Sequence, residues 1–265
     1  MRTLARIGCL ARSFVYLLIG IFALLVAMGN PYGKTTDATG VLRRLLEEQA
    51  FGRIILLGLA AALFCYTTWR ILQAWHDHEQ YGRTWPGLSV RWGFFFSGLA
   101  YGLLGAYAVV LTFGLTPLQS GSGERMMARW MLLQPLGRFV LMLTGIGVVL
   151  VGFLQFVQAF AGTYLRDLEL PKRHARWLTG VCSFGLIARG LTFAIVGVFF
   201  FNAGLKSRSR EAGGLHKAWE TLRQQPFGDY LLGLVAIGFI AFALFGVVEG
   251  FYRRSSAPRS SSKSR

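Results

Sequence analysis

The stretch GCLARSFVYLLIG at residues 8–20 sets a pattern that the chain uses three times. It returns as GFFFSGLAYGLLG at residues 93–105 and as GLIARGLTFAIVG at residues 185–197. Glycine stands at the first and last position of every copy, and an aromatic residue stands at the ninth. Because similarity at a long, regular interval is typical of a repeated structural unit, three copies of one unit are predicted.

A second, shorter phrase follows each copy of the first. It reads QAFG at residues 49–52, QPLG at 134–137 and QPFG at 225–228. From the first unit to the second, both phrases are displaced by the same 85 residues, which two unrelated phrases would not do by chance. Each unit is therefore interpreted as a helix opened by the first phrase, a connector, and a second helix opened by the second phrase.

The composition indicates that these helices cross a membrane. The 265 residues are 54% hydrophobic and 14% aromatic, and the mean hydropathy is +0.47, which is too apolar for an ordinary soluble domain. A crossing needs about 20 apolar residues of helix. Four runs without charge are long enough, and two more hold one arginine each, so six spans are predicted: 13–33, 92–123, 139–165, 230–248, 54–75 with Arg70, and 177–205 with Arg189.

The repeat also predicts a topology for this all-α integral membrane protein of six transmembrane helices. Each unit contains two crossings, so all three enter from the same face and form parallel tandem helical hairpins in a pseudo-threefold bundle. The units are predicted at residues 1–76, 85–162 and 176–253. The Ser-rich basic tail at 254–265 has nothing to bury and is predicted to be disordered.

The connectors within the units are predicted to be short amphipathic helices on the membrane surface. Apolar residues recur there at helical spacing, as at Val41, Leu42 and Leu45, with charged residues between them. A solvated loop with incidental apolar residues is the alternative. Residues 1–29 have the look of a signal peptide, but their counterparts later in the chain favour a retained first span.

The chain is strongly basic, with a formal net charge of +16. Its basic residues lie at helix ends and in the tail, so anionic lipid headgroups at the cytoplasmic face, not nucleic acid, are the expected counter-charge. Beside the spans, lysine and arginine are in small excess on the side that holds both termini. This asymmetry favours cytoplasmic N- and C-termini.

The repeated phrases resemble a bacterial membrane family catalogued as domain of unknown function 1206. The resemblance covers all three repeats and implies three tandem two-helix units in a bacterial inner membrane; it implies no activity. The chain departs from the family pattern at Ser97, Phe193 and Ala50. The residues that carry the resemblance are Ala11, Arg12, Tyr16, Gly20, Ala188, Arg189, Gly190, Gly197, and Gln225 to Gly228.

The glycines of the first phrase are predicted to pack helices together. Steps of four residues along 8–20 place its glycines on one ridge, where a neighbouring backbone can approach closely. The helix-packing glycines predicted in this way are Gly8, Gly20, Gly93, Gly105, Gly185 and Gly197.

Polar residues in the spans form the candidate site. An unpaired charge such as Arg189 in an apolar span costs several kcal/mol, on the order of 3, so it needs a partner. Two interpretations stay open: a polar cavity that binds an anionic solute or headgroup, and interhelical hydrogen bonds that hold the bundle. The three pairs expected, one in each hairpin, are Arg12 with Gln73, Ser97 with Gln158, and Arg189 with Glu249.

No cofactor, metal site or catalytic residue is predicted. No histidine lies within a span, which argues against haem held between helices, and the three cysteines form no closely spaced pair. Phosphate-binding glycine loops, nucleophile elbows and paired carboxylates are lacking in the sequence. A small-solute or lipid transporter or channel is the first functional hypothesis. A non-catalytic scaffold or accessory subunit that binds lipid or a protein partner is the alternative, and a membrane enzyme ranks last.

Overall fold

The computed structural model describes residues 2–29, 37–48, 51–76, 85–114, 122–162, 165 and 175–252, and these residues are helical apart from short turns and contain no strand. Six of the helices are long and apolar enough to cross a membrane, so the protein is a multi-pass membrane protein and the six predicted spans are confirmed. The predicted tail at 254–265 lies outside the described residues. The six helices are α1 (Arg2–Ala27), α3 (Gly52–His76), α4 (Trp85–Thr112), α6 (Gly137–Ala161), α7 (Ala175–Leu205) and α9 (Gly228–Tyr252).

The connectors are helices, as predicted. They are α2 (Ala38–Glu48), α5 (Ser122–Leu132) and α8 (Leu215–Arg223), the last preceded by a 3₁₀ turn, η2 (Ser209–Glu211). The apolar faces of α2 and α8 pack onto the helix bundle, where Leu42 and Trp219 are fully buried. On α5, by contrast, Met127 and Trp130 are exposed. Contact of the connectors with a membrane surface stays a prediction.

The second sequence phrase is the turn from a connector helix into a spanning helix. A Cβ placed on Gly137 would collide with the carbonyl oxygen of Met131, and one placed on Gly228 with the carbonyl oxygen of Arg223. The residue before each of these glycines has a positive φ, 65° at Leu136 and 60° at Phe227. Since any side chain at these glycines would strike backbone, glycine is required there.

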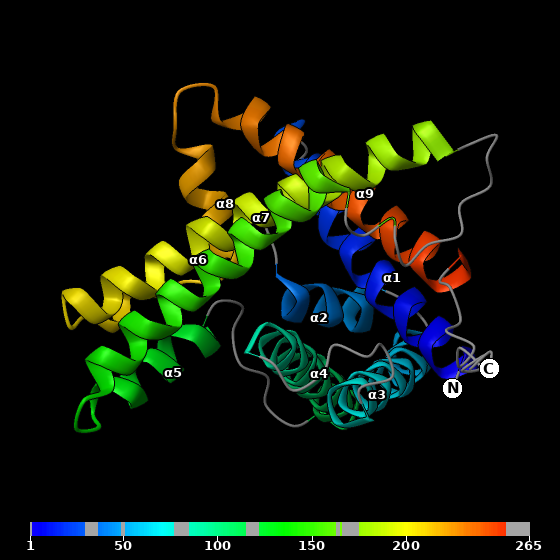
Figure 1. Ribbon diagram of the computed structural model, residues 1–265. Coiled ribbons are helices and arrows are strands. Elements are labelled where there is room, and N and C mark those ends of the chain that lie inside the picture. Colours follow the sequence, from blue (N-terminus) through cyan, green and yellow to red (C-terminus); the bar gives the residue numbers. More distant parts are fainter. Residues whose placement is uncertain are drawn as a thin grey trace, which may run out of the picture.

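Each spanning helix packs on the next in the order α4, α3, α1, α9, α7, α6, which we call the row. In Figure 1 the pair α3 and α4 and the pair α6 and α7 lie apart from each other. The helix pairs of the first and third repeats, α1 with α3 and α7 with α9, are neighbours in this row. The middle pair, α4 and α6, lies at its two ends and forms no packed pair within the described residues. A complete pseudo-threefold bundle would require that third contact, and the parallel entry of the three hairpins stays a prediction.

The main hydrophobic core lies at the centre of the row. Val15 and Ile19 of α1 meet Leu63 of α3 and Phe239 of α9, and all four are buried. Trp219 of α8 closes one end of this core, with its ring edge-on to that of Phe239 at 5.1 Å. Apolar side chains therefore fill the centre of the molecule along this core, and the polar residues of the spanning helices lie beside it.

Candidate functional site

Glycines of the repeated phrase bring the helices close together. A Cβ placed on Gly8 would lie 2.6 Å from the Cα of Tyr66, and one on Gly185 would lie 2.6 Å from the Cα of Phe242. Gly93 differs, because a Cβ there meets nothing within 4 Å. The other three predicted packing glycines also approach a neighbouring helix: Gly20 (Ala236 O, 3.0 Å), Gly105 (Leu63 Cβ, 3.4 Å) and Gly197 (Gly145 O, 2.7 Å).

Arg12 joins the first spanning helix to the last. Its side chain is buried, and the residue is only 4% exposed. One terminal nitrogen donates to a carboxylate oxygen of Glu249 at 2.7 Å, and the other donates to the hydroxyl of Tyr66 at 2.9 Å. The guanidinium also lies over the rings of Tyr66 and Phe242, at 5.4 Å and 5.5 Å. The cation is therefore paired, hydrogen-bonded and stacked, as a charge in an apolar span requires.

A second guanidinium reaches the same tyrosine from α3. Arg70 Nε donates to the Tyr66 hydroxyl at 2.8 Å, and a terminal nitrogen of Arg70 donates to Gln73 Oε1 at 3.2 Å. The Tyr66 hydroxyl oxygen thus accepts hydrogen bonds from two arginines, Arg12 and Arg70. This oxygen is the shared acceptor that ties α3 to α1.

A third guanidinium lies on the other side of the core, on α7. Arg189 Nε donates to the hydroxyl of Tyr16 at 3.2 Å, and a terminal nitrogen approaches Gln155 Oε1 at 3.5 Å. The Tyr16 hydroxyl also accepts from that of Tyr101 at 3.2 Å. Arg189 is stacked over the rings of Phe193 and Phe242, each at 4.6 Å. Of the matched aromatic positions of the three repeats, Tyr16 and Phe193 therefore contact Arg189, and Tyr101 joins them through its hydrogen bond to Tyr16.

These contacts form what we call the polar network, and every spanning helix contributes to it. Its two parts touch where the rings of Tyr66 and Tyr101 stand edge-on, with centroids 4.8 Å apart. Among its described members are three guanidinium groups and a single carboxylate, so the network carries an excess of positive charge. Its residues are Arg12, Tyr16, Tyr66, Arg70, Gln73, Tyr101, Gln155, Arg189 and Glu249.

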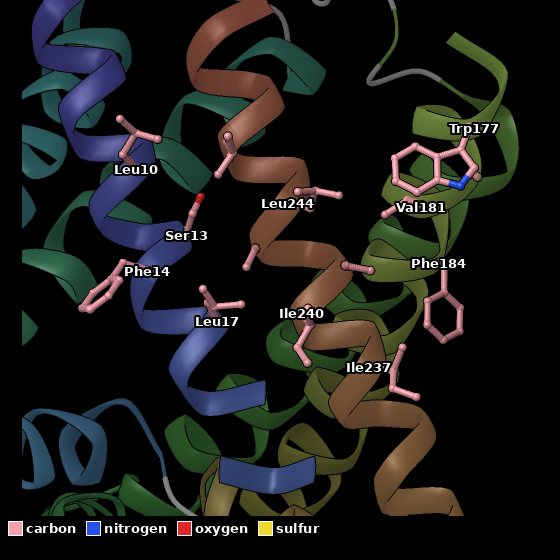
Figure 2. A pocket seen from close by; sticks show the side chains of 14 residues that line it. Leu10, Ser13, Phe14, Leu17, Trp177, Val181, Phe184, Ile237, Ile240 and Leu244 are labelled. Carbon is pink, nitrogen blue, oxygen red and sulfur yellow. The ribbon is translucent and has the colours of Figure 1, made fainter. Parts of the chain in front are cut away.

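An apolar groove of about 660 Å³ opens on the outside of α1, α9 and α7. Figure 2 shows Leu10 and Trp177 towards one end of it and Leu17 and Ile237 towards the other. The Ser13 hydroxyl, a polar group in its wall, is already bonded to the carbonyl oxygen of Cys9 at 2.7 Å. The groove therefore offers a ligand an apolar surface.

The relationship of the chain to known proteins follows the same three units. The family described as Domain of Unknown Function (DUF1206) matches residues 7–77, 92–162 and 184–253. The chain belongs to the DUF1206 family. The DUF1206 protein is also 28% identical over 258 residues to "Uncharacterized protein YxxB" of Bacillus subtilis (strain 168), a match that covers 96% of this chain and 91% of that protein. No solved structure matches it.

The DUF1206 protein arranges the predicted polar residues differently from the three expected pairs. Glu249 accepts from Arg12 of α1, on which α9 also packs, whereas Arg189 is bonded to Tyr16 and Gln155. Gln73 joins the network through Arg70. The pair of the middle repeat is not brought together: Ser97 is half-buried on α4, and Gln158 is exposed on α6 at the other end of the row.

Five members of the polar network were not among the predicted site residues: Tyr16, Tyr66, Arg70, Tyr101 and Gln155. For Gln155 the sequence did hold a signal, since it follows Gly145 and Gly152 at spacings that keep all three on one face of α6. That face packs on α7, where a Cβ on Gly152 would lie 2.6 Å from the carbonyl oxygen of Gly190. A polar residue on a glycine stripe points to a neighbouring helix, and Gln158 lies off that stripe.

Proposed function

We propose that this DUF1206 protein is a non-catalytic membrane protein that binds an anionic phospholipid, with one acyl chain in the groove between α1, α9 and α7. The observation that carries the proposal is the groove itself. Its volume of about 660 Å³ falls within the range of about 300–1,000 Å³ that is usual for small-molecule sites. Its apolar wall lies on helices that span the membrane, so the surrounding medium is acyl chains.

The charge at one end of the groove selects the headgroup. Arg6, one turn before Leu10, and Arg176, next to Trp177, are both exposed. They stand near the N-termini of α1 and α7, whose helix dipoles favour a phosphate. Tryptophan at this end is typical of the membrane–water interface. The proposal places this end, with both chain termini, at the cytoplasmic face of a bacterial inner membrane.

Transport of a solute along the interior is less well supported. A central route between the three repeats would pass the matched aromatic positions, where the hydroxyls of Tyr16 and Tyr101 are 3.2 Å apart. Beside them Arg12 is already paired with Glu249, and Phe239 and Trp219 fill the adjacent core. A lipid-binding protein, which agrees with the scaffold or accessory role considered from the sequence, needs no such route.

The test is to fill the groove without disturbing the fold. Gly180 lines the groove, and a Cβ there meets nothing within 4 Å, so Gly180→Trp places an indole in the acyl-chain position. Gly58→Trp on α3 is the matched control, because Gly58 is equally open but lies outside the groove. Native mass spectrometry of protein released from phosphatidylglycerol nanodiscs measures the lipid that stays bound.

We expect Gly180→Trp to weaken phosphatidylglycerol binding about tenfold, which corresponds to ~1.4 kcal/mol, and Gly58→Trp to leave it unchanged. Arg6→Gln with Arg176→Gln should abolish the preference for phosphatidylglycerol over phosphatidylcholine while neutral lipid still binds. Equal retention of lipid by wild type and a folded Gly180→Trp variant would show that the groove is not the site.

A further inference from the structure

The middle repeat lacks a contact that the other two repeats make. In the first repeat Gly8 of α1 packs on Tyr66 of α3, and in the third Gly185 of α7 packs on Phe242 of α9. These pairs occupy the same positions of the repeat, and the corresponding pair in the middle repeat is Gly93 of α4 and Val151 of α6. Gly93 faces open space, and Val151 is 46% exposed.

A second pair of positions repeats the difference. In the third repeat a Cβ on Gly238 of α9 would collide with the Cβ of Ala188 of α7. The matching residues of the middle repeat are Gly147 of α6, which has nothing within 4 Å, and Phe96 of α4, which is 60% exposed. A phenylalanine on one helix and a glycine on the other are complementary in shape, as a ridge and a groove.

The difference extends along both helices of the middle repeat. In α4 and α6, 22% of the apolar span is buried, against 39% to 56% in the other four spans. We call the two open surfaces the seam faces. On α4 the seam face is Gly93, Phe96, Ala100 and Leu103, all exposed. On α6 it is Thr144, which is half-buried, with Gly147, Val151, Leu154 and Gln158, which are exposed. Their counterparts on α1 and α3 are buried or half-buried: Gly8, Ala11, Val15 and Leu18, and Leu59, Ala62, Tyr66, Trp69 and Gln73.

The two seam faces of one chain are held apart by the packing of the row. α6 is locked on α7, since a Cβ on Gly145 would lie 2.7 Å from the carbonyl oxygen of Gly197. α4 is fixed on α3, where a Cβ on Gly102 would lie 3.1 Å from Thr67 Cγ2. Between them stands the α1/α9 interface with its buried ion pair. A second chain can supply the missing helix without breaking any of these contacts.

We propose that two copies of this chain form a twofold dimer in which the α4 seam face of each protomer packs on the α6 seam face of its partner. Each open face is then covered by the helix surface that covers the corresponding face in the first and third repeats. A twofold axis makes the two contacts of the dimer identical. Small residues on each face, such as Gly93 and Gly147, allow the close approach on which helix association in membranes depends. Ser97 and Gln158 come to the same interface.

Cysteine cross-linking in native membranes tests the dimer. The native cysteines Cys9, Cys65 and Cys182, none of which is in a disulfide, are first replaced by alanine. Two differently tagged chains are then co-expressed, one with Phe96→Cys and the other with Gly147→Cys. After mild oxidation we expect a disulfide-linked dimer that carries both tags. The control pair, Gly58→Cys with Gly180→Cys, lies off the seam faces and should give no more cross-linked product than random collision.

A single chain that carries both Phe96→Cys and Gly147→Cys decides between pairing partners. Cross-linked dimers support the proposal, whereas a disulfide within one chain would show that the protomer closes on itself and would overturn it. Absence of any cross-link would overturn it as well. As an independent readout, Gly147→Leu should convert dimers to monomers in single-molecule photobleaching, and the control Gly58→Leu should not. Leucine is tolerated at the position of Gly58 in the other two repeats, where the matching residues are Leu143 and Leu234. This test is independent of lipid in the groove.

Discussion

Removing the carboxylate of Glu249 should destabilise the protein far more than removing a surface carboxylate. Its oxygen accepts a hydrogen bond from the Arg12 guanidinium at 2.7 Å, and the side chains of Arg12 and Glu249 are 5% and 13% exposed. With an effective dielectric constant of ~20, two unit charges at that distance attract by about 6 kcal/mol. Glu249→Gln keeps an acceptor, and Tyr66 and the two rings still contact the guanidinium, so we expect a net loss of about 3 kcal/mol, at the lower end for a broken buried pair.

A double-mutant cycle isolates the pair. Arg12→Met together with Glu249→Gln removes the stranded cation and should recover most of the loss, which gives a coupling energy of about 2–3 kcal/mol. Unfolding is measured in mixed micelles titrated with sodium dodecyl sulfate and followed by circular dichroism. The exposed pair Lys206 and Glu211, 3.4 Å apart, is the control and should couple by less than about 1 kcal/mol.

The same cycle with Arg189→Met in place of Arg12→Met compares the pairing expected from the sequence with the one in the structure. Arg189 bonds to Tyr16 and not to Glu249, so this coupling should stay below about 0.5 kcal/mol. Coupling stronger for Arg189 than for Arg12, or no coupling for either, would refute the packing of α9 on α1 as described.

Two further predictions concern stability in the same unfolding assay. Trp219→Ala should lower the free energy of unfolding by about 3–5 kcal/mol, because the indole is buried in the core. Trp130→Ala on the equivalent connector helix α5, where the residue is 62% exposed, should lower it by less than about 1 kcal/mol. Similar losses for the two variants would contradict the burial of α8. Gly152→Leu should lower stability by about 3 kcal/mol, since its Cβ would lie 2.6 Å from the carbonyl oxygen of Gly190, and Gly58→Leu should be neutral; a tolerated Gly152→Leu would mean that α6 and α7 are not in contact.

The spans and connectors could be predicted from the sequence because each is determined locally. A membrane demands long apolar helices with internally satisfied backbones, so residues such as 139–165 identify α6 without knowledge of its neighbours. The turn glycines are also local, because Gly137 and Gly228 meet backbone within the preceding few residues. The repeat then transferred each assignment to the other two units.

Partners between helices could not be predicted in the same way. The expected pair of Arg189 with Glu249 assumes that polar residues meet inside each hairpin, but the order of helices in the row brings Glu249 to Arg12, 237 positions earlier in the chain. That order depends on which helix each glycine meets, and the glycine positions alone do not decide it. On α1, Gly8 meets Tyr66 of α3, whereas Gly20 on the same ridge meets Ile240 of α9. Symmetry misled for Gln158 because the middle hairpin alone leaves its two spanning helices unpaired in the described residues.

The ion pair between α1 and α9 also has a consequence for biosynthesis. Arg12 enters the bilayer with the first helix, but its carboxylate partner is made 237 residues later. At about 5–20 residues per second the ribosome needs roughly 12–47 s to reach it. During that interval the nascent protein holds a buried-span guanidinium without its counter-ion; at the centre of a spanning helix such a charge costs about 2.5–3.5 kcal/mol. A ribosome that stalls before Glu249 therefore leaves an incomplete bundle in which Arg12 lacks the carboxylate that neutralises it in the complete protein.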